Sequence, residues 1–408
     1  MAPKTDDMLA LSPSEEVWLK HLREIILFSP FLAYIYYLLA AACARRFFGR
    51  HGRPHADFLP PASILKPVRG LDREAYENFA SFCRLDYPEY EVLFGVSDPT
   101  DPSIPVIQQI IRDFPEHSIT LSTGLSSIGH NDKASILAHL AREAKNNLLV
   151  ASDSDTRAEK DYLRVLVAPF SNPKVGAVTC LYRGIQAGSL AETLEAVGIS
   201  SDFFSGVFVA SQFAGVRFAL GAAMATTRDR LQEIGGFETL AGFLLDDYEL
   251  GRRISERGYH VELLPYAVSM VLPAESFRGF WQRQLRWAVG IRSARPWSHL
   301  GLLLAQGLPL SLIAAVLSRS GREACAYIAA YLVTRFMMAW TVGVWGLKDP
   351  ILLRKWWLVP LRDATAFCAW LASFRYNRVK WRGNAFYVRK GQLVPAAVGA
   401  ETDSVTPD

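Results

Sequence analysis

The stretch NLLVASDSD, residues 147–155, is a short apolar run that ends in two carboxylates, Asp153 and Asp155. Three similar apolar runs precede it: ASILKPV (62–68), YEVLFGVSD (90–98) and SITLSTG (118–124). Two helical patterns separate the later runs: IPVIQQIIRDF (104–114) and KASILAHLAREAK (133–145). Strands that alternate with helices predict an α/β fold with a mostly parallel sheet. Ligands of such sheets bind at the carboxyl ends of the strands, so acidic residues there are the first candidates for a site.

The composition of the 408-residue chain excludes several classes of protein. Half of the residues are hydrophobic and 21% are charged, which argues against disorder. The net charge of +4 is too small to indicate a nucleic-acid-binding protein. The five cysteines are scattered and form no CxxC pair, so neither a zinc site nor a disulfide framework is predicted.

The hydrophobic excess lies at the two ends of the chain. Residues 25–44 carry no charge over 20 positions, which is enough for a helix to span a bilayer. The preceding segment, residues 1–24, holds three basic and five acidic side chains, whereas four arginines follow between Arg45 and Arg53. The positive-inside rule therefore predicts that the chain after Arg45 is cytoplasmic.

The C-terminal region, residues 299–374, is apolar again and predicts transmembrane or interfacial segments. Residues 300–318 carry no charge, 324–347 carry only Arg335, and 351–374 are interrupted by charges. The basic tail, residues 375–408, favours the cytoplasm, which conflicts with a simple count of four spans. An interfacial or re-entrant segment at 351–374 would remove this conflict, and the sequence leaves the question open.

Residues 60–296 are mixed in polarity and long enough for one α/β domain. Two of its strand-like runs end in carboxylates, at Asp98 and at Asp153 with Asp155, about 55 residues apart. Asp98 also suits a simple turn. The DxD pair suits a hard divalent cation, Mg²⁺ or Mn²⁺, which can balance the charge of a diphosphate leaving group. Glycine loops of the GxxxxGK[ST] and GxGxxG types are absent, which argues against P-loop and Rossmann enzymes.

Two further patterns follow. Asp246 and Asp247 precede a helical stretch, so they either complement the helix dipole or include a general base aimed at an acceptor hydroxyl. The sequence SFRGFWQRQLRWAVGIRSARP, residues 276–296, is aromatic and basic. It suits a helix at the membrane surface, and its arginines and indole also suit a clamp for a diphosphate and a sugar ring.

Taken in order, these blocks resemble the membrane glycosyltransferases of the family 2 type with a GT-A fold. Within them the chain is most similar to the ceramide glucosyltransferase family (family 21), including bacterial relatives that act on hopanoid lipids. The resemblance rests on ILKPVRGLD (64–72), LDYPEYEVLFGVSDPTDP (85–102), GHNDKASIL (129–137), LLDDYELGRRISERGY (244–259), RQLRW (283–287) and the Trp-Arg-Gly at 381–383.

The resemblance implies a GT-A domain flanked by transmembrane helices, and it implies roles for individual residues. Asp247 is the expected catalytic base, and Asp153 with Asp155 is the expected metal site. The residues expected to contact the UDP-sugar are Lys66, Gly70, Asp98, Asn131, Lys133, Asp153 and Asp155. The residues expected to clamp the diphosphate and acceptor are Arg283, Gln284, Arg286 and Trp287.

The expected reaction is an inverting transfer of glucose from UDP-glucose to the hydroxyl of a ceramide-type membrane lipid. A divalent cation is the expected cofactor, and the expected site is the cytoplasmic face of a bacterial plasma (inner) membrane. The animal enzymes carry Asp-Ser-Gly where this chain has Asp-Ser-Asp, and a His near the place of Phe203. These departures leave the acceptor open.

Four alternatives therefore remain at this stage. The first is a UDP-N-acetylglucosamine-dependent enzyme that acts on hopanoids. The second is a processive polysaccharide synthase, and the third is a transferase acting on polyprenyl phosphate. The fourth, from another class, is a transporter, suggested by Arg335, Arg362 and Asp363 inside apolar segments.

Overall fold

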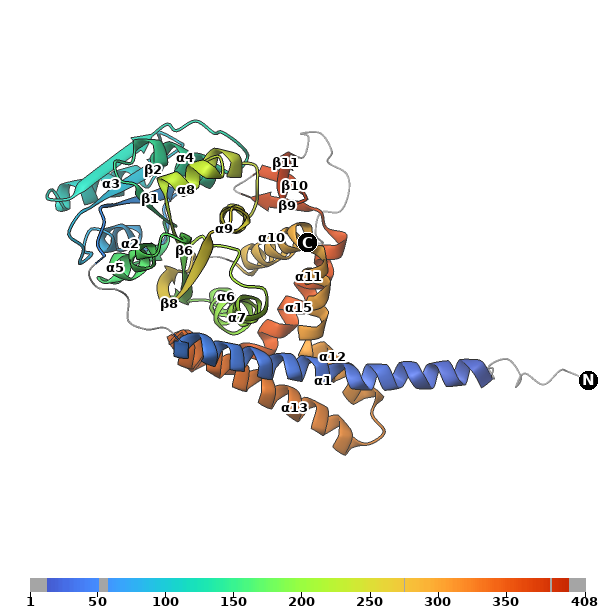
Figure 1. The fold of residues 1–408 in the computed structure, drawn as a ribbon. Coiled ribbons are helices and arrows are strands. Elements are labelled where there is room, and N and C mark those ends of the chain that lie inside the picture. Colours follow the sequence, from blue (N-terminus) through green and yellow to red (C-terminus); the bar gives the residue numbers. More distant parts are fainter. Residues whose placement is uncertain (1–12, 51–57, 275, 382–383, 396–408) are drawn as a thin grey trace, which may run out of the picture.

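The computed structural model describes residues 13–50, 58–274, 276–381 and 384–395. Its centre is an eight-stranded sheet in the order β3-β2-β1-β4-β7-β6-β8-β5 (Figure 1). The strands are β1 (Ala62–Val68), β2 (Tyr90–Val96), β3 (Ser118–Thr123), β4 (Leu148–Ser152), β5 (Thr156–Arg157), β6 (Val175–Ile185), β7 (Ala223–Thr227) and β8 (His260–Val271). The apolar runs predicted as strands correspond to β1–β4.

The pairing of the strands brings the predicted strand ends together. β1 pairs in parallel with both β2 and β4, and β2 pairs in parallel with β3. β7 lies antiparallel between β4 and β6, so the sheet is mixed but mostly parallel, as the sequence predicts. The residues that follow β1 and β4 therefore emerge side by side at one edge of the sheet.

Short helices cover the sheet. They are α2 (Ala75–Ser81), α3 (Ile104–Asp113), α4 (Asp132–Glu143), α5 (Tyr162–Val167), α8 (Arg228–Glu233) and α9 (Asp246–Glu256). α4 approaches β2 closely at Gly95, where a Cβ atom would lie 2.5 Å from the side chain of Ile136. Because glycine leaves that space, α4 packs flat on β1 and β2 and its N-terminus reaches the edge where the strands end.

A second layer lies between the sheet and the apolar helices. It consists of α6 (Leu190–Gly198), a π-helical turn at Ile199–Phe203, and α7 (Phe204–Phe213). α6 packs on β6 and α7 packs on the long N-terminal helix α1 (Pro13–Arg50). Residues 190–213 are long and apolar enough for a span, yet most of them are buried inside the protein. The sequence analysis did not single out this segment.

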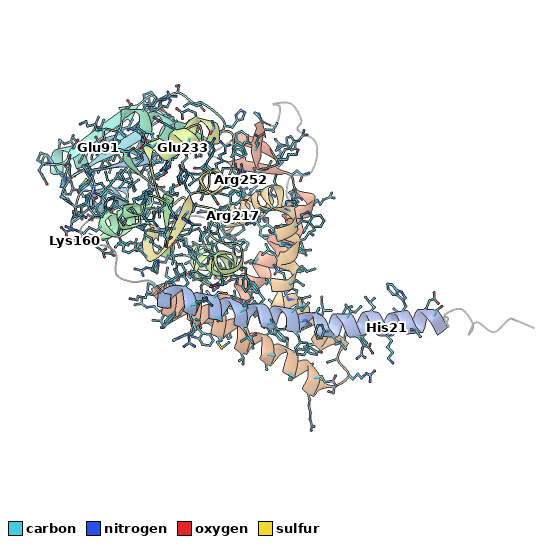
Figure 2. All side chains as sticks on the ribbon, viewed as in Figure 1. His21, Glu91, Lys160, Arg217, Glu233 and Arg252 are labelled. Atoms are coloured by element: carbon cyan, nitrogen blue, oxygen red, sulfur yellow. The ribbon has the colours of Figure 1, made fainter. Side chains whose placement is uncertain are left out.

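The apolar helices form the third part of the molecule (Figure 1). Besides α1 they are α11 (Pro296–Gly301), α12 (Gly307–Leu317), α13 (Gly321–Ala339), α14 (Pro350–Lys355) and α15 (Val359–Arg375). In the described part of the chain, 3 helical stretches suit a membrane span by length and composition, and one of them is the mostly buried 190–213 of the second layer. The number rises to 4 if the bent pair 296–305 and 307–317 counts as one span. α1 includes the predicted span 25–44, and its first turns, up to about His21, project beyond the other helices (Figure 2).

Residues 351–374, whose place the sequence leaves open, fold as α14 and α15, and neither helix is a candidate span. α10 (Phe277–Ala294) precedes the apolar helices and packs on α15. The chain continues into a small antiparallel sheet of β9 (Arg378–Trp381), β10 (Asn384–Arg389) and β11 (Gln392–Pro395). Arg53, Arg382, Gly383 and the tail beyond residue 395 lie outside the described residues.

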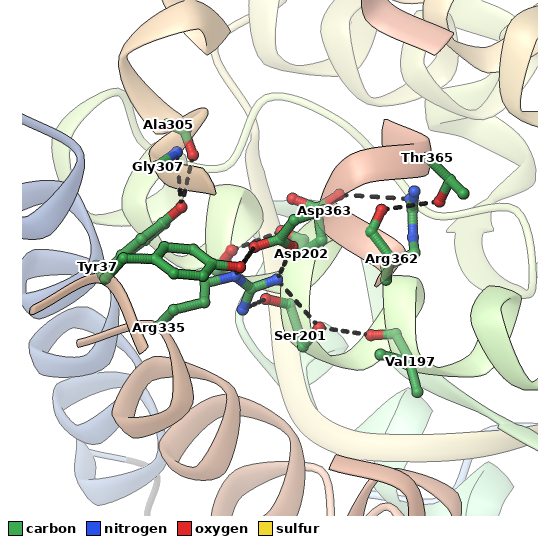
Figure 3. Close-up of polar contacts among 12 residues, drawn as sticks. Tyr37, Val197, Ser201, Asp202, Ala305, Gly307, Arg335, Arg362, Asp363 and Thr365 are labelled. Atoms are coloured by element: carbon green, nitrogen blue, oxygen red, sulfur yellow. Dashed lines mark hydrogen bonds and ion pairs between the residues drawn. The ribbon is translucent and has the colours of Figure 1, made fainter. Parts of the chain in front are cut away.

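One hydrophobic core joins the sheet domain to the apolar helices. Leu181 of β6, Phe204 of α7, Tyr37 of α1 and Tyr331 of α13 belong to the same buried cluster. Deep in this region the Arg335 guanidinium forms a bidentate ion pair with Asp363, at 2.8 and 2.7 Å (Figure 3). The intramembrane arginine on which the transporter alternative rested therefore has a partner inside the protein.

Candidate active site

The first site residue is Lys66, which lies in β1 beside the end of β4. Its side chain is fully buried, and its ammonium donates a hydrogen bond of 2.6 Å to the backbone carbonyl of Asp153. The ammonium also lies 3.8 Å from the centre of the Phe82 ring. Burial lowers the pKa of Lys66 to about 7, although Asp153 and Asp155 oppose this shift. A negatively charged ligand at this edge would restore the ammonium's charge.

Gly221 is the point at which three other candidates meet. A Cβ atom on Gly221 would lie 2.7 Å from Lys133 Nζ, 3.1 Å from Asp247 Oδ2 and 3.7 Å from Asp153 Oδ2. The Gly221 N–H donates to Asp247 Oδ2 at 2.8 Å, and the Gly221 carbonyl accepts from Lys133 at 3.2 Å. The loop before β7 therefore brings the end of β4, the start of α4 and the start of α9 together.

Lys133 connects these carboxylates. Its ammonium forms an ion pair of 2.6 Å with Asp153 Oδ1. Burial alone would lower the pKa of Lys133, but the charges of Asp153, Asp246 and Asp247 outweigh burial and raise it. Lys133 therefore remains protonated and supplies a fixed positive charge between the two predicted carboxylate sites.

Asp247 has the properties of a general base. It begins α9, and besides the contact with Gly221 its Oδ1 accepts from the Tyr248 N–H at 2.7 Å. Burial, together with the neighbouring charge of Asp246, raises the pKa of Asp247 to about 6, and Lys133 opposes the increase. A carboxylate with this pKa is ionised at neutral pH and is a stronger base than a solvated aspartate.

Asp155 has the properties of a cation ligand. Its Oδ1 is buried and has no hydrogen-bond partner in the described part of the chain, and burial together with Asp153 and Asp72 raises the pKa of Asp155 to about 7. No group of three or more His, Cys, Asp or Glu side chains among the described residues could hold a metal ion. Asp155 and Asp153 fit a divalent cation, but two carboxylates do not complete its coordination. Such a cation would also need oxygen ligands from a bound diphosphate.

Asn131 contributes by holding the site together. Its Oδ1 caps α4 by accepting from the Ala134 N–H at 3.1 Å. Its Nδ2 donates to the Phe243 carbonyl at 2.9 Å and to Asp246 Oδ1 at 3.1 Å. This fully buried amide fixes the start of α4 against the start of α9. The structure thus gives Asn131 a supporting position, and contact with the nucleotide stays a prediction.

Two predicted residues follow β1 and β2 at the same edge of the sheet. Gly70 has a φ of 75°, which favours glycine, and its N–H donates to the buried carboxylate of Asp101 at 2.7 Å. Asp98 is exposed, and its carboxylate accepts from the Thr100 N–H and hydroxyl at 2.8 and 2.7 Å. These hydrogen bonds lower the pKa of Asp98 and are those expected of a turn residue. A contact of Asp98 with uracil or ribose stays a prediction.

The clamp residues lie on α10. Gln284 is buried, and its amide bonds Glu195 of α6 and Arg362 of α15 at 3.4 and 3.0 Å. Arg283 pairs with Glu195 at 3.4 Å. Arg286 and Trp287 follow on the same helix and are half-buried. The predicted clamp is thus anchored on α6, in the layer that contacts the apolar helices, and on α15.

Sequence analysis missed several residues of this region. Gly221 has no motif around it, because its importance comes only from the three side chains that surround it. Tyr182 of β6 is close enough to Asp247 and Glu195 for both charges to add to the effect of burial and raise its pKa. Its ring packs on Phe203 with centroids 5.9 Å apart. Glu195 and Arg362 are far apart in sequence, and only the fold brings them to Gln284.

A family profile described as glycosyl transferase family 21 matches residues 25–394. The chain belongs to this family. It is 25% identical over 348 residues to ceramide glucosyltransferase 3 of Caenorhabditis elegans, covering 83% of this chain and 75% of that one. It is 26% identical over 161 residues to the poly-beta-1,6-N-acetyl-D-glucosamine synthase of Staphylococcus aureus, covering 39% and 38% of the two chains.

Among solved structures, the chain resembles the mannosyltransferase PcManGT from Pyrobaculum calidifontis in complex with GDP-Man and Mn²⁺. The TM-score is 0.51 at 21% identity, covering 86% of this chain and 99% of that one. This likeness confirms the GT-A fold predicted from the sequence. The family 21 protein is therefore a hexosyltransferase of the ceramide glucosyltransferase family, and its apolar helices indicate a membrane protein.

Proposed function

We propose that this family 21 enzyme transfers glucose from UDP-glucose to the hydroxyl of a ceramide-type membrane lipid, with inversion at the anomeric carbon. The observation that carries the proposal is the position of Asp247. Its carboxylate is held by the Gly221 N–H at 2.8 Å, next to Lys133 and Asp153 at the strand ends where nucleotide-sugars bind in such sheets.

In the proposed reaction the lipid hydroxyl oxygen attacks the anomeric carbon while Asp247 accepts the hydroxyl proton. The bond between that carbon and the β-phosphate oxygen breaks, and UDP leaves with the negative charge. Lys66 and Lys133 lie where they offset this charge, and Arg286 is the predicted third cation. A divalent cation held by Asp153 and Asp155 would supply further positive charge there. The proposed reaction uses one general base and no protein nucleophile. It is therefore a single displacement, which inverts the anomeric carbon and gives a β-glycoside.

The arrangement of the layers supports a lipid acceptor. The layer of α6 and α7 separates the sheet from α1, and α10 with its clamp residues packs on α15. An acceptor that comes from the bilayer would approach Asp247 from this side, whereas the nucleotide would bind at the strand ends. We place the sheet domain on the cytoplasmic side, as the arginines that follow residue 44 predict.

The comparisons favour a lipid over a growing polysaccharide. The similarity to a ceramide glucosyltransferase extends over 83% of the chain, whereas the polysaccharide synthase matches only 39%. A hopanoid acceptor with UDP-N-acetylglucosamine as donor remains the second candidate. Its support is Phe203, which lies near the place where the animal ceramide glucosyltransferases carry a histidine, so the acceptor of this chain can differ from theirs. Both pairs of substrates enter the test.

The test uses the full chain in detergent or in vesicles with ceramide or a hopanoid and either UDP-glucose or UDP-N-acetylglucosamine. We expect β-glucosylceramide in the lipid mass spectrum. Asp247→Asn should abolish transfer while UDP-glucose binding, measured by calorimetry, is retained. Asp229→Asn, on exposed α8, is the matched control and should behave as the unmodified enzyme. Normal turnover of Asp247→Asn would refute the base assignment, and a hopanoid product or a polymer would refute the acceptor.

A further inference from the structure

A buried arginine on α15 connects the apolar helices to the predicted acceptor clamp. α15 packs against α12 on one side and against α6 and α10 on the other. Arg362 is only 7% exposed, and its Nη2 donates a hydrogen bond of 3.0 Å to Gln284 Oε1. The same nitrogen lies 3.4 Å from Asp202 Oδ2 in the π-helical turn after α6 (Figure 3). Gln284 is thereby held at its carbonyl oxygen by Arg362 and at its amide by Glu195.

Gly198, the last residue of α6, makes room for this arginine. A Cβ atom on Gly198 would lie 2.0 Å from Arg362 Nε and 2.8 Å from Nη2. Glycine weakens a helix relative to alanine, so a glycine at a buried helical position needs a reason in the packing. The reason here is the guanidinium of Arg362, which lies directly against the backbone of α6.

Stability does not explain the arginine. Two of its donors, Nε and Nη1, are buried and have no hydrogen-bond partner among the residues that the structure describes. Burying unpaired donors opposes folding, and apolar side chains of similar volume are often at least as stabilising as a buried ion pair. Arg362 is charged, buried and only partly hydrogen-bonded, and it contacts Gln284. We take this as an indication that Arg362 serves the predicted acceptor clamp and not stability.

We propose that Arg362 is a positioning residue that sets the amide of Gln284 for the acceptor lipid, and that Gly198 is the space that makes this possible. The inference rests on the proposed function, because Gln284 belongs to the predicted acceptor clamp. Loss of Arg362 lets Gln284 rotate, which weakens acceptor binding. The strand-end residues that bind the nucleotide keep their contacts, since none of their hydrogen bonds involves α15.

The experiment compares four variants of the full chain: Arg362→Met, Arg362→Lys, Gly198→Ala and Gly206→Ala. Arg362→Met keeps the length of the side chain without its donors, and Arg362→Lys retains one donor for Gln284. Gly198→Ala leaves the arginine in place but occupies its space. Gly206→Ala is the matched control on the same helical segment, because a Cβ there meets no atom closer than 3.8 Å.

Acceptor KM, UDP-glucose KM, UDP-glucose hydrolysis and Tm are measured for each variant. Arg362→Met and Gly198→Ala should raise the acceptor KM about tenfold, the effect of losing one charge-assisted hydrogen bond. Their UDP-glucose KM and hydrolysis should stay within about twofold, although the Tm of Arg362→Met should fall, because buried Gln284 Oε1 loses its donor. Arg362→Lys should retain part of the acceptor affinity that Arg362→Met loses, and Gly206→Ala should leave it unchanged.

Two results would overturn the proposal. An unchanged acceptor KM in Arg362→Met would show that Gln284 does not depend on the arginine. A lower Tm with equal losses toward both substrates would show that Arg362 is only structural. Failure of the proposed function is recognised separately, because then the unmodified enzyme itself transfers no glucose to ceramide.

Discussion

Replacing Gly221 by alanine tests whether the site depends on the close approach of Lys133, Asp153 and Asp247. The new methyl group would lie 2.7 Å from Lys133 Nζ and 3.1 Å from Asp247 Oδ2, so the ammonium must move by about 0.7 Å to reach an ordinary contact of 3.4 Å. The backbone of Gly221 has no positive φ, so alanine adds no backbone strain and acts through space alone.

The expected effect follows from this displacement. A shift of this size in a catalytic group lowers the rate by about 100-fold, which corresponds to about 2.7 kcal/mol in the activation free energy. The assay measures initial rates of glucose transfer from radiolabelled UDP-glucose to ceramide. Gly242→Ala is the matched control, because no atom lies within 4 Å of a Cβ at that position.

If Gly221→Ala keeps kcat within about twofold of the unmodified enzyme, the three side chains do not act as one site, whatever their distances. A loss of activity in which both Gly221→Ala and Gly242→Ala unfold at the same lower temperature would point to folding instead of geometry. A thermal melt of both variants therefore accompanies the kinetics.

Three further predictions concern charge and support. The rate of transfer should rise with pH as Asp247 loses its proton near pH 6. Asp246→Asn removes a like charge and should move this rise to lower pH, whereas Lys133→Met removes an opposite charge and should move it to higher pH. A pH profile of kcat/KM for each variant tests both directions. Opposite directions would contradict the assigned electrostatics. Asp155→Asn should raise the Mn²⁺ concentration that gives half-maximal activity by at least about tenfold. Metal titration after chelation measures this concentration, and an unchanged value would exclude Asp155 as a ligand. Asn131→Ala should lower the free energy of unfolding by about 2 kcal/mol, since it removes the cap of α4 and a donor to Asp246, and denaturant titration would test it; a loss below about 0.5 kcal/mol would count against the supporting role.

Much of the fold follows from local patterns in the sequence. The apolar runs and helical periods predicted β1–β4, α3 and α4, because burial of those segments depends mainly on their own residues. Asp153, Asp155 and Asp247 were predicted from strand ends and a helix start, and Lys66 from the family resemblance. The structure brings these residues to one edge of the sheet, and their roles stay predictions. Asp98 was predicted either as a turn residue or as a nucleotide contact, and it makes the hydrogen bonds of a turn residue.

The remainder depends on contacts that only the folded chain creates. Gly221 is one of several glycines in the chain, and its neighbours come from three separate elements. The α6–α7 segment contains Glu192, Glu195 and Asp202, so it did not look like a span, although its apolar residues are buried between two layers. Asp363 pairs with Arg335 on another helix and not with the adjacent Arg362, and no local pattern in the sequence indicates this choice. Successive residues on a helix point in different directions, which explains why the two adjacent residues do not pair.

The hydrophobic core shared by the sheet domain and the apolar helices has a consequence for biosynthesis. Leu181 and Phe204 leave the ribosome well before Tyr331 and Val342, which complete their packing. During synthesis this face of the domain is therefore exposed until α13 and the turn after it have emerged and packed on it. The final maturation of the transferase domain thus depends on the C-terminal helices, and truncation after residue 296 should leave an aggregation-prone domain.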